Sequence, residues 1–388
     1  MNRKRQIGIF SVISLAVVLM VLGVLFSSSM APTSMVATYR PTMLPHPPRE
    51  FEVKIPSVYP ADGVPRPVAF WLPQDSKRLA IVISGLVGNS TDGLSYTFSE
   101  PFRRRGFSVL ILPSPSHWTF AFHLMPKDRR TSYTESVTAL CRSIESVLTP
   151  EVRGRLSQVV MTGYSLGARH AISTVPCAQP LFPSAQMSVM AVNPPTSLSY
   201  AAATLDRLLA DSRKRVVDLC LNGFSIGVLG AVSGAVASSA SSPSELRRSL
   251  DFFLRPFFMY EQSLKELAAA SFAVRLEPIL TGIENPKYRL QTEMESFSFA
   301  RVLVDGPLSM ESFVDEIRRS PLSRPRTREG ISVMHSRDDF LVTPQEVDQL
   351  IEELGPTSRA FDHGGHVGLI FEPLFEEWFE AAEEARSR

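Results

Sequence analysis

The most constraining feature of this 388-residue sequence is an apolar run that leads into a serine flanked by glycines. The segment reads Val159-Val160-Met161-Thr162-Gly163-Tyr164-Ser165-Leu166-Gly167, and a helix-compatible stretch follows. Gly-x-Ser-x-Gly between a strand and a helix is typical of a nucleophile elbow, whose tight turn needs the glycines. A helix N-terminus would stabilise negative charge near the hydroxyl of Ser165. An ordinary glycine-rich strand–helix turn is the alternative interpretation.

Short apolar runs alternate with helix-like stretches from about residue 51 onward. The expected strands are Val68–Leu72, Leu79–Ser84, Phe107–Pro113, Gln158–Thr162, Met187–Val192, Gly330–His335 and a short Arg359–Phe361. The expected helices are Leu94–Arg105, Ser132–Leu148, Ser165–Thr174, Thr343–Leu354 and Pro373–Ala385. Several strands are apolar at nearly every position, as in a sheet covered on both faces. The alternation predicts an α/β fold with a mostly parallel central sheet flanked by helices.

The alternation is interrupted between about residues 196 and 328, where the sequence reads as helical. This insertion is too long for an unstructured loop, and we expect a helical cap over the carboxyl ends of the strands. Leu219–Ala237 is uncharged and has glycines at small-xxx-small spacing, like a packed membrane helix. A membrane crossing there would separate Ser165 from His366. We therefore favour a cap helix or a contact with the membrane surface.

The N-terminus predicts an anchored, exported protein. Basic residues between positions 3 and 5 precede an uncharged, mostly apolar run from Ile7 to Phe26, which is long enough to cross a bilayer. We expect a signal anchor over 1–26, a proline-rich tether over 27–50 and a domain over 51–388 outside the cytoplasm, periplasmic or extracellular. The alternative is a secreted protein whose signal peptide is cleaved near Ser29-Met30-Ala31.

Charge and cysteine content exclude several classes of function. The formal net charge of +1 gives no basis for a nucleic-acid partner. Cys141, Cys177 and Cys220 are too widely spaced for a zinc knuckle or a redox pair, and at most one disulfide is possible. The simplest interpretation is that all three are small buried apolar residues. We expect no metal and no organic cofactor.

A serine nucleophile needs a base and an acid, and in this type of sheet they follow it along the chain. His366 is the expected base because glycines on both sides form a loop able to reach Ser165. His363 is the alternative. The expected acid lies just past the next-to-last strand, where Asp338 and Asp339 are both candidates.

An oxyanion hole needs two backbone N–H groups. One is expected from Leu166, directly after the candidate nucleophile. The other is expected from Leu86, in the glycine-containing loop that follows the strand ending near Ser84. A plain strand–helix turn is the alternative interpretation of that loop.

Taken in order, four motifs resemble the α/β-hydrolase superfamily, in particular its esterase and lipase branches. They are Ser84-Gly85-Leu86-x-Gly, Gly163-Tyr164-Ser165-Leu166-Gly167, Asp338-Asp339 and Gly365-His366. The similarity covers residue 51 to the C-terminus apart from the insertion. In the family pattern, Val or Ile stands three residues after the acid and a Pro follows. Val342 and Pro344 fit this pattern, so the resemblance implies Asp339 rather than Asp338 as the acid. Ser84 stands where that branch has histidine, and Phe340 stands where it usually has proline.

The resemblance implies a serine hydrolase that cleaves a carboxylic ester, with a small-molecule or lipid ester as substrate. An acyltransferase or thioesterase with the same three residues is the first alternative. A non-catalytic scaffold that binds protein or lipid is the second.

Overall fold

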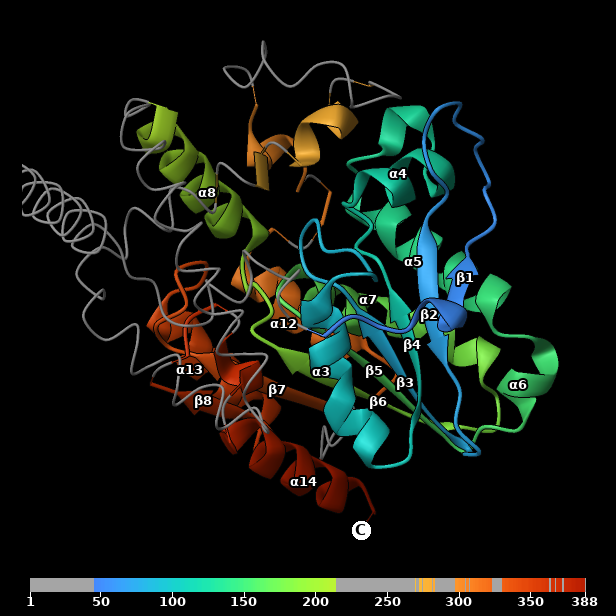
Figure 1. Cartoon of the computed structure of the whole chain (residues 1–388). Helices are drawn as coiled ribbons and strands as arrows, with labels where there is room; N and C mark the ends of the chain where they lie inside the picture. The colour runs from blue at the N-terminus through green and yellow to red at the C-terminus, as the bar shows by residue number, and fades with distance from the viewer. Residues whose placement is uncertain are drawn as a thin grey trace, which may run out of the picture.

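An eight-stranded, mostly parallel sheet lies at the centre of the computed structural model (Figure 1). The structure describes residues 45–213; 269, 272–273, 275–280 and 282; and 297–387 except 304, 307, 323–329, 363, 367 and 372. The predicted anchor over 1–26, the segment 219–237 and the candidate base His363 lie outside these residues.

The strands run in the order β1-β2-β4-β3-β5-β6-β7-β8. Only the β1–β2 and β2–β4 pairs are antiparallel. The strand bounds are β1 Glu52–Lys54, β2 Val68–Leu72, β3 Arg78–Ile83, β4 Ser108–Leu112, β5 Gln158–Tyr164, β6 Gln186–Val192, β7 Ile331–Ser336 and β8 Arg359–Phe361. Because parallel strands end at the same edge, the loops after β3, β5, β6 and β7 meet there.

Helices cover both faces of the sheet. Alternate residues of each strand point to opposite faces, so Val82 of β3 joins one core cluster and Ile81 joins the other. The first cluster packs against α3 (Gly93–Arg104) and α14 (Pro373–Ser387). The second packs against α4 (Trp118–Leu124), α5 (Tyr133–Val147), α7 (Leu166–Ala178), α8 (Leu198–Arg213), α12 (Met310–Arg319) and α13 (Pro344–Leu354). The remaining described elements are a short α6 (Pro150–Gly154), single 3-10 turns and the helical residues 269, 272–273 and 275–280.

The predicted strands and the five predicted helices are all present, with ends that shift by at most a few residues. Strand β1 was not predicted, because three residues carry too little alternation to identify a strand. Helix α4 was not predicted either. Its sequence is buried almost all round, so it lacks the amphipathic period that marks a helix.

The predicted insertion contains helices α8 and α12 in its described part. Helix α12 begins with a capping box at Ser309 and Ser312. It packs against α13 and buries Phe313 and Ile317 in the second core cluster, the one that contains Ile81. Among the described residues, no helix has the length and apolar content needed to cross a membrane.

The interpretation of all three cysteines as small apolar residues is wrong for two of them. Cys141 of α5 and Cys177 of α7 form a disulfide, with Cα atoms 6.2 Å apart. The two helices pack side by side on one face of the sheet, which makes neighbours of positions separated by 36 residues. Cys220 lies outside the described residues.

His170 is a buried base that lies beside the cation Arg169. Its ring stacks on Tyr133, with centroids 4.8 Å apart, and neither ring nitrogen has a hydrogen-bond partner in the described part of the chain. Burial lowers the pKa of His170 to about 3, and the adjacent Arg169 charge adds to the shift. The ring is therefore neutral in the folded protein and protonates on unfolding below about pH 6.5.

We expect His170 to make the fold sensitive to acid. Because the unfolded state binds more protons, stability is complete above about pH 6.5 and falls as the pH drops toward 3. The free energy of unfolding of the native protein should fall by about 2 kcal/mol more than that of His170→Phe between about pH 7.5 and 5. Urea unfolding of both proteins at the two pH values measures this difference. A replacement of the exposed His46 by Phe is the control, and it should behave like the native protein.

Candidate active site

Ser165 occupies the sharp turn between β5 and α7. Its φ of 57° and ψ of −134° place a non-glycine residue in a rarely populated backbone region. The Ser165 N–H donates to the carbonyl of Val192 at the end of β6, at 2.9 Å. This hydrogen bond ties the turn to the neighbouring strand.

The glycines of the pentapeptide are required by close backbone approach. A Cβ on Gly163 would lie 2.6 Å from the carbonyl oxygen of Ile83, and one on Gly167 would lie 2.2 Å from the same atom. No side chain fits at such distances. The elbow therefore packs directly on the end of β3, and it is not an ordinary glycine-rich turn.

The structure brings Ser165, His366 and Asp339 into contact. His366 Nδ1 lies 2.9 Å from Asp339 Oδ2, and His366 Nε2 lies 2.6 Å from Ser165 Oγ. An ionised carboxylate only accepts hydrogen bonds, so Nδ1 carries the proton and donates to Asp339. In the neutral ring, Nε2 then accepts from the Ser165 hydroxyl. The serine hydroxyl is thus aligned to lose its proton to His366.

The carboxylate of Asp339 is buried and ionised. Asp339 is 3% exposed, and burial alone would raise the pKa of its carboxyl group. The electrostatic interaction with His366, the hydrogen bond that the ring donates and a further hydrogen bond from the Leu341 N–H outweigh this effect, so the pKa of Asp339 lies below its usual value. Asp339 can therefore hold the His366 ring in one orientation and stabilise its protonated form.

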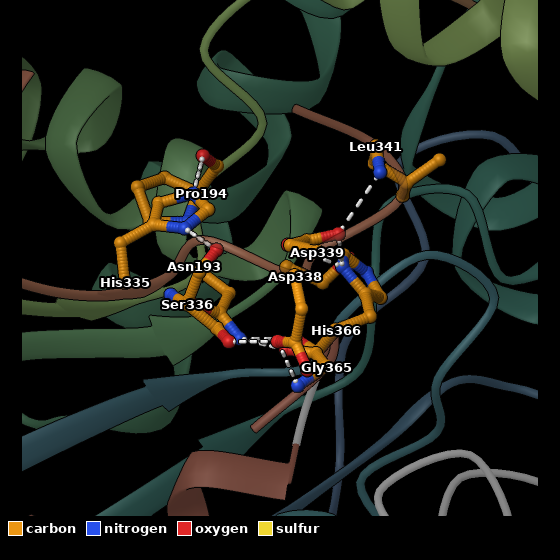
Figure 2. Close-up of polar contacts among 10 residues, drawn as sticks. Asn193, Pro194, His335, Ser336, Asp338, Asp339, Leu341, Gly365 and His366 are labelled. Carbon is orange, nitrogen blue, oxygen red and sulfur yellow. Dashed lines mark hydrogen bonds and ion pairs between the residues drawn. The ribbon is translucent and has the colours of Figure 1, made fainter. Parts of the chain in front are cut away.

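Asp338, the other candidate acid, has different partners. Its Oδ1 accepts from the Gly365 N–H at 2.7 Å and its Oδ2 accepts from the Gly364 N–H at 3.4 Å. Figure 2 shows Asp338 on the backbone of the segment Gly364–His366, called the histidine loop below, and Asp339 on the His366 ring. The geometry favours Asp339 as the partner of His366.

The candidate oxyanion hole is formed by two turns at the same sheet edge. Leu166 opens α7, where the first N–H groups have no acceptor within the helix. Leu86 lies in a tight turn closed by a hydrogen bond of 2.9 Å from the Gly88 N–H to the Gly85 carbonyl. Val87 in this turn has a φ of 55°, which is strained for a β-branched residue. Such strain is a common mark of functional loops.

Hydrogen-bonded side chains pack next to the Leu86 turn. The hydroxyl of Ser95 lies 2.8 Å from that of Ser84 and 3.0 Å from that of Tyr164. A Cβ on Gly85 would lie 2.9 Å from the Tyr164 ring, so only glycine fits there. The residue before the candidate nucleophile thus packs against the loop that carries Leu86.

The parallel sheet, the elbow between β5 and α7, and the chain order of serine, aspartate and histidine together decide the fold. The chain has the α/β-hydrolase fold. The predicted α/β fold with a mostly parallel central sheet flanked by helices is therefore confirmed.

No protein-family model and no curated protein sequence matches the chain. Among solved structures it is similar to an esterase from Pyrococcus furiosus, at 15% identity and a TM-score of 0.45 over 89% of this chain and 91% of that one. It is similar to a hydrolase from Oleispira antarctica, at 11% identity and a TM-score of 0.43 over 82% and 94%. A bacterial membrane phospholipase A gives 13% identity and a TM-score of 0.43 over 100% of both chains. Likenesses this distant assign no activity.

Two residues near the site were not identified from the sequence. Asn193 follows β6 directly and bonds to the histidine loop. A polar residue at the end of an apolar strand was the available signal, since ligands and reacting groups gather at that edge. Phe340 was noted only as a departure from the family pattern, and its ring lies edge-on to His366 with centroids 5.6 Å apart.

A cavity of about 610 Å³ lies elsewhere, among α5, α7 and α12. Tyr133, Ser173 and Glu316 are among its lining residues, whereas Ser165 and His366 are not. Among the described residues, no cluster of three or more His, Cys, Asp or Glu side chains is placed to hold a metal ion.

The elbow should tolerate no side chain at Gly167. Gly167→Ala places a Cβ against the Ile83 backbone, and we expect a loss of several kcal/mol in the free energy of unfolding, or failure to fold. Gly154→Ala is the matched control, because nothing lies within 4 Å of its Cβ position at the end of α6. Thermal unfolding of both variants tests the prediction. Equal melting temperatures for Gly167→Ala and the native protein would contradict it.

Proposed function

We propose that this chain is a serine hydrolase that cleaves carboxylic esters through an acyl-enzyme. The observation that carries the proposal is the continuous hydrogen-bonded chain from Ser165 Oγ to His366 and from His366 to Asp339. A serine hydroxyl becomes nucleophilic only when a base takes its proton, and His366 is in contact with that proton. Asp339 orients the base.

In the acylation step, Ser165 Oγ attacks the ester carbonyl carbon while its proton moves to His366 Nε2. The carbonyl oxygen becomes an oxyanion, and we assign the N–H groups of Leu86 and Leu166 to hold it. The C–O bond to the alcohol then breaks, and the alcohol leaves with the proton from His366. The acyl group remains on Ser165.

In the second step, water replaces the alcohol. His366 takes a proton from the water, whose oxygen attacks the acyl carbonyl carbon. Collapse of this second oxyanion breaks the bond to Ser165 Oγ, which recovers its proton from His366. The products are one carboxylic acid and one alcohol, and the enzyme is regenerated.

The side chains at the site favour an apolar acyl group. Leu86 and Phe340 are apolar and only partly buried, and they lie on the oxyanion turn and against the His366 ring respectively. Partly exposed apolar surface beside a reacting centre is the usual lining for an apolar substrate. We therefore assign small-molecule or lipid esters as the substrate class.

The first test uses a fluorophosphonate probe, which reacts covalently with activated serines. Ser165→Ala should abolish labelling and ester hydrolysis, because the attacking oxygen is removed. Ser146→Ala, an exposed serine on α5, is the control and should label at the native rate. Undiminished labelling of Ser165→Ala would rule the assignment out.

We also propose that the domain works outside the cytoplasm, tethered by the N-terminal segment. Two features support this location. Basic residues precede the apolar run over 7–26, and a disulfide joins α5 to α7. Disulfides persist mainly in oxidising compartments.

Cell fractionation with thiol alkylation tests the location. The full chain should sediment with membranes, and Cys141 and Cys177 should react with an alkylating reagent only after denaturation and reduction. A variant that lacks residues 1–26 is the control. It should remain in the cytoplasm, and both thiols should react after denaturation without any reduction. A full chain found soluble with both thiols free would contradict the proposed location.

A further inference from the structure

Asn193 lies where three parts of the candidate site meet. It directly follows β6, whose neighbours are β5, which leads to Ser165, and β7, which leads to Asp339. Its side chain is completely buried, and its φ of 48° lies in the left-handed region, which asparagine tolerates better than most residues. A buried amide in a rare backbone conformation must be held by specific partners.

Every hydrogen-bonding group of the Asn193 side chain is used in holding the site. Its Nδ2 donates to the carbonyl of Gly365 at 2.9 Å and to the carbonyl of His366 at 2.6 Å. Its Oδ1 accepts from the N–H of Ser336 at 2.9 Å, at the end of β7. Figure 2 shows this amide between the β7 end and the histidine loop. The Asn193 side chain therefore joins the end of β7, which leads to Asp339, to the loop that carries His366.

Asp338 binds the N–H groups of the same loop. Its carboxylate accepts from Gly365 at 2.7 Å and from Gly364 at 3.4 Å, and it also accepts from the Ser336 hydroxyl. Gly365 is thus fixed on both sides, its N–H by Asp338 and its carbonyl by Asn193. The two side chains clamp the residue directly before His366.

The loop needs such a clamp because it contains two glycines. Gly364 has a φ of 145° and Gly365 a φ of 59°, conformations that glycine reaches without steric cost. The same freedom makes an unheld diglycine segment highly variable. The His366 ring must nevertheless keep its 2.6 Å contact with Ser165. A displacement of about 1 Å can cost a reaction about 100-fold.

Val192, the residue before Asn193, connects β6 to the Ser165 turn. The carbonyl of Val192 accepts the N–H of Ser165 at 2.9 Å, so two consecutive residues hold the nucleophile turn and the histidine loop. The relative position of Ser165 and His366 is therefore set through the end of β6.

We propose that Asn193 and Asp338 are positioning residues that set the place of His366 by clamping its loop. This inference rests on the proposed function, since it assigns a role relative to Ser165 and His366. It gives Asp338 a task separate from that of Asp339.

The test compares Asn193→Asp, Asp338→Ala and Asp338→Asn in ester hydrolysis. Asn193→Asp keeps the shape and the acceptor for Ser336, but it places an acceptor against two carbonyls. It should lower kcat about 100-fold with little change in KM. Asp338→Ala should act similarly, and Asp338→Asn should recover most of the loss, because its amide oxygen can still accept from Gly365. Ser188→Ala is the control and should be unchanged, because this buried serine of the same strand has no hydrogen-bond partner for its hydroxyl among the described residues.

A second background separates positioning from general structure. In His366→Ala, Asn193→Asp should cause no further loss of fluorophosphonate labelling, because its effect passes through the missing ring. The same fold-loss in both backgrounds would overturn the proposal, and so would native rates for both Asn193→Asp and Asp338→Ala. Asn193→Gly, which keeps the left-handed backbone, replaces Asn193→Asp if that variant does not fold.

A spectroscopic measurement keeps this test independent of the proposed function. The downfield proton NMR signal of the His366 Nδ1–H to Asp339 hydrogen bond should weaken or vanish in Asn193→Asp and persist in Ser188→Ala. An unchanged signal in Asn193→Asp would overturn the clamp even if Ser165 proves not to be the nucleophile. Labelling of Ser165→Ala would instead overturn the proposed function and leave this signal to decide the clamp.

Discussion

The contact between the elbow and the end of β3 is the constraint on which the candidate site depends. Gly163 and Gly167 bring the backbone of the β5–α7 turn so close to Ile83 that no side chain fits between them. This approach places the Leu166 amide and the Ser165 hydroxyl beside the loop that carries Leu86. The proposed convergence of the Leu86 and Leu166 N–H groups on one oxyanion requires this close approach of the two backbones.

A buried polar network then holds the base against this elbow. Asn193 and Asp338 bind the backbone of the histidine loop, and Asp339 binds the ring. Buried polar groups are costly when unpaired, so a network with its partners in place favours one arrangement over all others. Rigidity around His366 thus comes from hydrogen bonds, in a loop whose glycines would otherwise allow wide motion.

Much of the fold and of the candidate site was predictable because its signals are local. Apolar runs identify the parallel strands, and Gly-x-Ser-x-Gly identifies the elbow, since each pattern reflects the backbone of its own segment. Asp338, Asp339 and His366 were candidates because they follow strands near the C-terminus, and the family resemblance supplied the order of serine, acid and histidine. The Cys141–Cys177 disulfide and the role of Asn193 were not predictable, because each depends on a partner far along the chain.

The sequence by itself determined the α/β layering, the elbow and the candidate groups at the sheet edge, because strand periodicity and glycine requirements act over a few residues. Only the tertiary structure decided which aspartate meets the His366 ring and what holds the loop. Asp338 and Asp339 are adjacent and chemically identical, and their side chains leave the backbone in different directions. In the packed sheet, where β6 lies between β5 and β7, Asp339 contacts the His366 ring and Asp338 binds the backbone of the histidine loop.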